Sequence, residues 1–119
     1  MARSTPIERL GAYERLYREL TEEITQIGFI SSGSVIARYT HCGNPGCRCN
    51  KTPPELHGPY WQWSSKVKGV TVTKRLNDAE AKLYKEWITN DRRLHALITK
   101  MRKVSKQALD VMLKEVAND

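Results

Sequence analysis

Between Tyr60 and Leu76 the sequence reads YWQWSSKVKGVTVTKRL, with apolar and polar residues alternating on both sides of Lys68-Gly69. Alternation with a period of two is typical of a β-strand with one buried face. A two-residue turn that contains glycine joins antiparallel strands. The stretch therefore predicts a hairpin with one largely apolar face and one polar, basic face. Its predicted cross-strand pairs are Val67 with Val70, Ser65 with Val72, Trp63 with Lys74, and Trp61 with Leu76.

A helix is predicted on each side of this hairpin. The first, residues 6–27, has apolar residues spaced by three and four and begins with a capping box formed by Thr5 and Glu8. The second, residues 78–116, contains no proline or glycine and follows a capping box of Asn77 and Glu80. Its early apolar residues are predicted to pack on the hairpin: Leu83, Tyr84, Trp87 and Ile88. Farther along, a second apolar row has the same three-and-four spacing: Leu94, Leu97, Met101, Val104, Ala108 and Val111.

These elements predict an α+β fold. A chain of 119 residues is about the size of one domain, so we expect a single domain over residues 1–119. It divides into a helix (6–27), a zinc loop (28–58) with a short strand near residues 34–39, the β-hairpin (59–76) and the long helix (78–116). Because the first helix is too short to cover the whole apolar seam of the second, we expect the part of the long helix beyond Arg93 to pair with a second copy in a homodimer.

Three cysteines and a histidine form the clearest chemical motif. CGNPGCRC runs from Cys42 through Cys47 to Cys49, and His57 follows, which gives the spacing C-x4-C-x-C-x7-H. Three thiolates and one imidazole complete the closed tetrahedral shell of a structural zinc ion. The odd number of cysteines and the absence of an export signal favour metal over disulfides. Asn44-Pro45-Gly46-Cys47 is predicted to be a type II turn, with Gly46 at positive φ, and Cys47 and Cys49 are expected on one extended step.

Other interpretations of this motif stay open. His41 is an alternative fourth ligand to His57. Three unliganded buried thiols, an iron–sulfur cluster and a catalytic cysteine–histidine pair are less favoured, because a cluster normally needs four cysteines and the pair lacks an orienting third group.

The positive charge is concentrated around the hairpin and the zinc loop. From Gly28 to Asn77 there are seven basic residues and the single acid Glu55, a net charge of +6. Such a local field is typical of a protein that binds a polyanion, and we expect duplex DNA, with the hairpin in the major groove. For these basic residues the alternative is a solvated strand face, with Lys74 over Trp63 as a cation–π pair. Trp61 and Trp63 are expected in the core rather than as base-stacking platforms. The candidate nucleic-acid-binding residues are Arg38, Arg48, Lys51, Gln62, Lys66, Lys68, Lys74 and Arg75.

The motif also resembles a known family. The chain is similar to small bacterial and phage proteins that tend to be encoded beside transposases and site-specific recombinases. This resemblance implies the metal ligands and a mobile-element context. It rests on Gly33-Ser34, Arg38-Tyr39-Thr40, Cys42-Gly43, Pro45-Gly46-Cys47-Arg48-Cys49 and His57-Gly58-Pro59-Tyr60.

Together these features predict a zinc-binding, DNA-binding accessory or regulatory protein of a mobile element, with a recombinase or transposase as a candidate partner. The rivals are a protein–protein adaptor acting through the long helix and an RNA or single-stranded DNA binder. An enzyme is not expected, because the central module has no paired acid and base and four protein ligands would leave zinc no open position. No apolar run approaches the roughly 20 residues of a membrane span, so we expect a cytoplasmic protein with no membrane partner.

Overall fold

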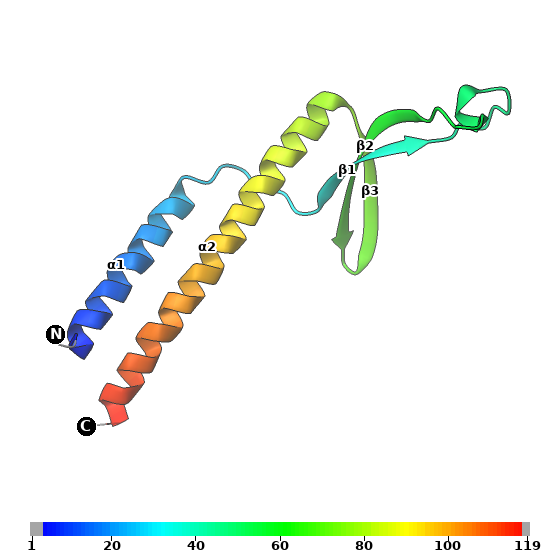
Figure 1. Ribbon diagram of the computed structural model, residues 1–119. Helices are drawn as coiled ribbons and strands as arrows, with labels where there is room; N and C mark the ends of the chain where they lie inside the picture. Colours follow the sequence, from blue (N-terminus) through cyan, green and yellow to red (C-terminus); the bar gives the residue numbers. More distant parts are fainter. Residues whose placement is uncertain (1–3, 118–119) are drawn as a thin grey trace. The chain divides into compact units, whose positions relative to one another are not determined.

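The computed structural model describes residues 4–117 of the chain. It contains two helices and three strands (Figure 1). In chain order the elements are α1 (Pro6–Thr25), β1 (Ser34–Thr40), the 3-10 turn η1 (Arg48–Asn50), β2 (His57–Val67), β3 (Val70–Leu76) and α2 (Asp78–Ala117). The α+β prediction is confirmed. Neither helix contains an apolar stretch long enough to cross a membrane within residues 4–117.

These elements form two compact units. The helical unit consists of residues 4–28 and 92–117, and the sheet unit consists of residues 29–91. The single helix α2 contributes its first 14 residues, 78–91, to the sheet unit and the rest to the helical unit. The prediction of one domain over residues 1–119 stays a prediction.

The helical unit is built on the predicted three-and-four spacing. Leu20 of α1 is buried against Leu97 and Val104 of α2. Tyr13, Ile24, Ile27 and Met101 pack around these three residues. Val111 is also buried. The apolar row of α2 that was predicted to pack on a second copy is therefore largely covered by α1 of the same chain.

Both predicted capping boxes are present. The Thr5 hydroxyl accepts a hydrogen bond from the Glu8 amide at 3.1 Å, and the Glu8 carboxylate accepts one from the Thr5 amide at 3.4 Å. At the start of α2, Asn77 and Glu80 exchange the equivalent bonds at 2.8 and 3.1 Å. These bonds satisfy backbone N–H groups that have no partner within a helix, so each helix begins where the sequence predicts.

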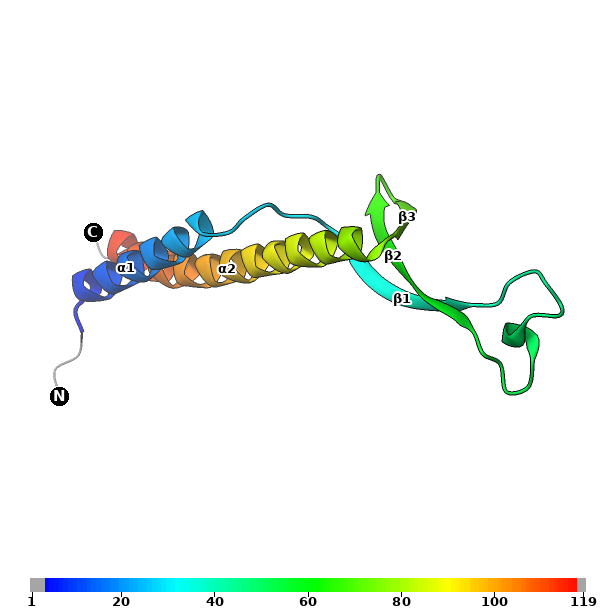
Figure 2. The same cartoon turned by 90° about the horizontal axis from the view of Figure 1, so that it is seen from above.

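The sheet is antiparallel with the order β1-β2-β3. All four predicted hairpin pairs are present, and Lys68 and Gly69 form the turn with positive φ. β1 adds the third strand and pairs with the first part of β2, from Thr40 opposite His57 to Ser34 opposite Ser64. Figure 2 shows β1 and β2 continuing beyond β3 to the loop that contains η1.

The start of α2 covers one part of the apolar sheet face. The Trp63 and Tyr84 rings lie 5.3 Å apart between centroids, and the Trp61 indole N–H donates to Asp78 Oδ1 at 2.8 Å. Leu76 is buried. Lys74 Nζ lies 6.0 Å from the Tyr84 ring centroid, which corrects its expected position over Trp63.

The rest of the apolar face is less covered than predicted. Val67, Val70 and Val72 near the hairpin tip are exposed, because α2 begins one residue after the opposite end of β3. Leu83 is 54% exposed, and the Trp87 ring packs on Phe29 at 5.2 Å between centroids. The predicted packing of Leu83 and Trp87 on the hairpin is therefore wrong.

Candidate functional site

The four candidate metal ligands lie at the end of the β1–β2 pair. Thr40 opposite His57 is the last pair of this ladder, and His57 is the first residue of β2. Cys42 follows β1 by two residues, and Cys47 and Cys49 belong to the turn η1 and its N-cap. The strands therefore bring together residues that are up to 15 positions apart in the chain.

The four side chains fit one tetrahedral ion. The cysteine Sγ atoms and one His57 ring nitrogen all lie within 4.8 Å of one another. Cys42 Sγ and Cys49 Sγ are 3.6 Å apart, and Cys47 Sγ is 3.1 Å from His57 Nε2. A tetrahedral zinc site with Zn–S bonds of about 2.3 Å has sulfur–sulfur edges of roughly 3.8 Å. His41 is exposed and lies outside this group, so His57 is the histidine that completes the candidate cluster.

The loop reaches this geometry by a different turn from the one predicted. The Cys47 amide donates to Asn44 O at 3.1 Å, which closes the turn, but Gly46 does not have positive φ. The Gly46 amide instead donates to Asn44 Oδ1 at 3.0 Å, an interaction by which asparagine stabilises a turn itself. The type II prediction is therefore wrong. The extended step expected between Cys47 and Cys49 is also replaced by a 3-10 turn.

Backbone and side-chain hydrogen bonds support the ligands from outside. The Cys42 amide donates to Cys49 Sγ at 3.2 Å. The Asn50 side-chain amide donates to Asn44 O at 2.7 Å. The Cys49 side chain is fully buried. Hydrogen bonds of this kind fix the direction of a thiolate before a metal binds.

The environment of the thiols favours a cation. Hydrogen bonds from the Cys49 backbone, and then from the side chains of Cys42 and Cys49, lower the pKa of Cys47 to about 6. For Cys49, the Cys42 backbone hydrogen bond favours the thiolate, but burial and the neighbouring thiols Cys42 and Cys47 raise its pKa overall. A divalent cation removes this conflict, because it stabilises all three thiolates together.

A second group of polar side chains lies on the sheet face opposite α2. Arg38 Nη1 donates to Gln62 Oε1 at 3.3 Å, which links β1 to β2. Gln62 is directly opposite Arg75 of β3, and the Arg75 guanidinium lies 3.8 Å from the Tyr60 ring centroid. We call Arg38, Gln62 and Arg75 the basic face. A hollow of about 360 Å³ lies over it, and no acidic residue is among those that line it: Arg38, Thr40, Tyr60, Trp61, Gln62, Thr73 and Arg75.

Residues 10–85 match the family described as "Domain of unknown function (DUF6788)". The chain belongs to this family. The DUF6788 segment contains all three strands and the four candidate metal ligands. Family membership agrees with the resemblance to small proteins, whereas a gene context beside transposases and recombinases stays a prediction. Neither the curated proteins nor the solved structures contain a match to the chain.

The DUF6788 segment does not bring all eight predicted nucleic-acid-binding residues onto one surface. Lys66 shares the side of the sheet that carries the basic face, but it lies nearer the hairpin tip, opposite Thr71. Lys68 is in the turn, and Lys74 points to the other side of the sheet. Arg48 and Lys51 lie between β1 and β2, in and just after η1, where Arg48 forms an exposed ion pair with Glu55 at 3.7 Å.

The prediction missed Tyr60, which supports Arg75 by a cation–π contact. The signal was present in the sequence. Tyr60 is two residues before Gln62 on the same strand face, and Gln62 is the predicted neighbour of Arg75. Diagonal neighbours of this kind are within reach of aromatic and long side chains.

Proposed function

We propose that the protein is a zinc-binding, DNA-binding accessory or regulatory protein of a mobile genetic element, and that it binds duplex DNA through the basic face. One observation carries the DNA-binding part. Two guanidinium groups from the outer strands flank Gln62 of the central strand, and the hollow above them is free of acidic residues. Guanidinium groups bind phosphate oxygens through two parallel hydrogen bonds, which makes paired arginines suited to a nucleic-acid backbone.

Zinc has a structural role in this proposal. Cys42, Cys47, Cys49 and His57 supply four ligands, so the metal has no open position for a substrate. When bound, zinc would fix the end of the β1–β2 pair. Arg38 lies four residues before Cys42, so a metal-ordered strand end also fixes one arginine of the basic face.

Gln62 is the candidate for sequence recognition. A glutamine amide can form two hydrogen bonds with the major-groove edge of adenine, whereas arginine contacts to phosphate carry no sequence information. Here the amide oxygen of Gln62 accepts a hydrogen bond from Arg38, which orients the side chain. The mobile-element role, and a recombinase or transposase as partner, rest on the family resemblance alone.

Salt titration of DNA binding tests the proposal. The double variant Arg38→Ala/Arg75→Ala removes two charges from the basic face, and the log-log salt slope should fall by about 1.8 on a random duplex, since each phosphate contact contributes about 0.9. The matched control is Lys74→Ala/Lys85→Ala. It removes the same charge from side chains that lie over Tyr84 and Trp61 on the opposite side of the sheet, and its slope should stay unchanged.

Equal slopes for wild type and the basic-face variant, both folded and zinc-loaded, would remove this face from the DNA interface. Replacing Gln62 with alanine should change the preference among duplex sequences and leave the salt slope nearly constant. Tighter binding to single-stranded DNA or RNA than to duplex would favour the single-strand alternative.

A protein–protein adaptor is the second candidate, and an exposed apolar area of the sheet unit favours it. Phe29 packs on Trp87 and is 76% exposed, and Ile30 and Leu83 are also exposed beside a hollow of about 370 Å³. The backbone here is held by hydrogen bonds from the Asn90 side chain to Phe29 O and from the Ser31 amide to Trp87 O. Fixed, exposed apolar side chains are typical of an interaction site. The adaptor function predicts no measurable binding to duplex DNA, single-stranded DNA or RNA.

A further inference from the structure

The helical unit has an apolar surface that its own core does not use. Leu109, Met112, Leu113 and Val116 of α2 are all more than half exposed. Helix geometry places Leu109 and Val116 about 100° or more around the axis from the buried Leu97, Val104 and Val111, and places Met112 about 60–100° from them. α2 therefore carries two apolar sides in this unit, one packed on α1 and one open. A contiguous exposed apolar area of this kind marks an interaction site.

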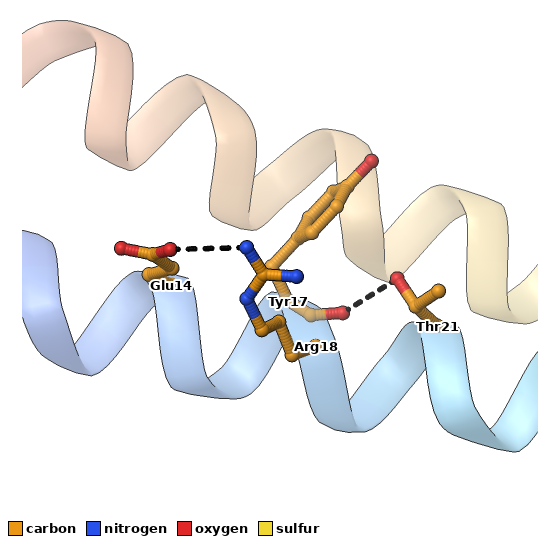
Figure 3. A network of polar contacts seen from close by, with 4 residues as sticks. All are labelled: Glu14, Tyr17, Arg18 and Thr21. Carbon is orange, nitrogen blue, oxygen red and sulfur yellow. Dashed lines mark hydrogen bonds and ion pairs between the residues drawn. The ribbon is translucent and has the colours of Figure 1, made fainter.

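The open side continues onto α1 through Tyr17. Figure 3 shows the Tyr17 ring reaching across to α2, beside the Glu14–Arg18 ion pair at 3.3 Å and the Thr21 hydroxyl bonded to Tyr17 O. Two hollows adjoin Tyr17, of about 390 and 420 Å³, and Tyr17 and Ser105 line both. Leu10, Ala108 and Met112 line the first, and Ile98, Met101 and Leu109 line the second. We call this surface the open helical face.

The charges of the two helices indicate what covers this face. α1 has three basic and five acidic residues, a net charge of −2. Residues 92–117 of α2 have seven basic and two acidic residues, a net charge of +5. A polyanion would be attracted by the positive charge of α2 but repelled by the negative charge of α1. A strongly basic partner would be attracted by α1 but repelled by α2. A second copy supplies both signs, and a two-fold axis brings α1 of each copy to α2 of the other.

The size of the unit gives a second reason. Two helices bury only a few large side chains, and small cores are commonly completed by association. Four helices in a bundle enclose apolar sides that two helices leave in water.

We propose that two copies of the chain pack their open helical faces together, forming a four-helix bundle in which α1 of each copy lies against α2 of its partner. This proposal goes beyond DNA binding and does not depend on it. It also replaces the residues expected from the sequence: Leu97 is part of the core within each chain, and Leu109 and Met112 form the contact between chains.

Sedimentation equilibrium of the full, zinc-loaded chain tests this contact. The wild type should show twice the mass of one 13.7 kDa chain. Leu109→Glu puts a charge into the contact and should raise the dissociation constant of the dimer by more than about tenfold, as expected for a buried interface residue. The matched control is Gln107→Glu, which adds the same charge two residues away, on the opposite side of α2, and should leave the dimer intact.

Circular dichroism and zinc content show whether each variant keeps its helices and metal. If Leu109→Glu loses helicity, the milder Met112→Gln takes its place in the comparison. A wild-type monomer at every concentration overturns the proposal, as does equal dissociation by Leu109→Glu and Gln107→Glu. A monomer that binds a different protein through the open helical face overturns it as well.

Discussion

His57 has two structural roles at one position. It pairs with Thr40 at the end of the β1–β2 ladder, and its Nε2 atom lies 3.1 Å from Cys47 Sγ. A metal held by His57 therefore acts directly on the strand pairing. His41 is only one residue beyond β1, yet its side chain is exposed and outside the ligand group.

This difference gives a paired test at the level of single residues. His57→Ala should reduce bound zinc well below one ion per chain and lower the thermal midpoint of unfolding, because metal-binding energy in a small domain is largely folding energy. His41→Ala should leave both unchanged. Elemental analysis and thermal denaturation provide the two readouts. Full zinc content in the His57 variant, or its loss in the His41 variant, would show that the fourth ligand has been misassigned.

The cluster of candidate metal ligands could be predicted from sequence because zinc requires particular side chains, and four residues of these types lie within 16 residues. The backbone conformation of Gly46 could not be predicted in this way. A Pro-Gly pair fits a type II turn well, but the Asn44 side chain hydrogen-bonds the Gly46 amide and stabilises another geometry. This competition between side chain and backbone is decided by local energies that the residue pattern does not contain.

Among the elements, the β1–β2 pair contains an irregularity close to both candidate sites. Its register shifts between Arg38 and Thr40, opposite Gly58 and its neighbours. Gly58 has a φ of +133°, and a Cβ atom there would lie 2.6 Å from Arg38 O. Only glycine fits this conformation and this close approach of two strands.

Gly58→Ala should therefore destabilise the fold by roughly 1–3 kcal/mol, the usual cost of forcing a side chain into such a backbone region. Denaturant unfolding measures this change. Gly43→Ala, in the segment between β1 and η1, is the matched control, because a Cβ atom at Gly43 meets nothing within 4 Å and its φ is not positive. If Gly58→Ala and Gly43→Ala have equal free energies of unfolding, the register shift in the β1–β2 pair does not require glycine at position 58.

The strands and helices illustrate what sequence patterns determine. The hairpin register followed from the period of two and the Lys68-Gly69 turn, and α2 began after the predicted Asn77 cap. The sequence pattern did not predict which of the apolar residues are buried by another element. Leu83 and Trp87 have the spacing of core residues, but whether a spaced residue meets another element depends on the path of the helix past the sheet.

At the scale of the whole chain, the candidate metal ligands and the helical core belong to different compact units. Cys42, Cys47, Cys49 and His57 lie in the sheet unit, whereas Leu20, Leu97 and Val104 lie in the helical unit. Removing the metal should therefore affect the two units unequally.

Hydrogen exchange after treatment with a chelator can measure this. Backbone amides of residues 40–60 should lose protection, because the end of the β1–β2 pair is no longer fixed, while amides around Leu20 and Val104 should keep it. Uniform loss of protection throughout residues 4–117 would contradict this expectation. It would show one cooperative unit, in support of the predicted single domain.

The sheet order β1-β2-β3 leaves the outer edges of β1 and β3 without a strand partner within residues 4–117. Such edges are templates on which other chains can add strands and form aggregates, and charged side chains are a common protection. Here Arg38 lies on one edge strand, and Lys74 and Arg75 lie on the other. The arginines of the basic face therefore also help to keep the protein in solution, so variants that neutralise them should precipitate more readily when DNA is absent.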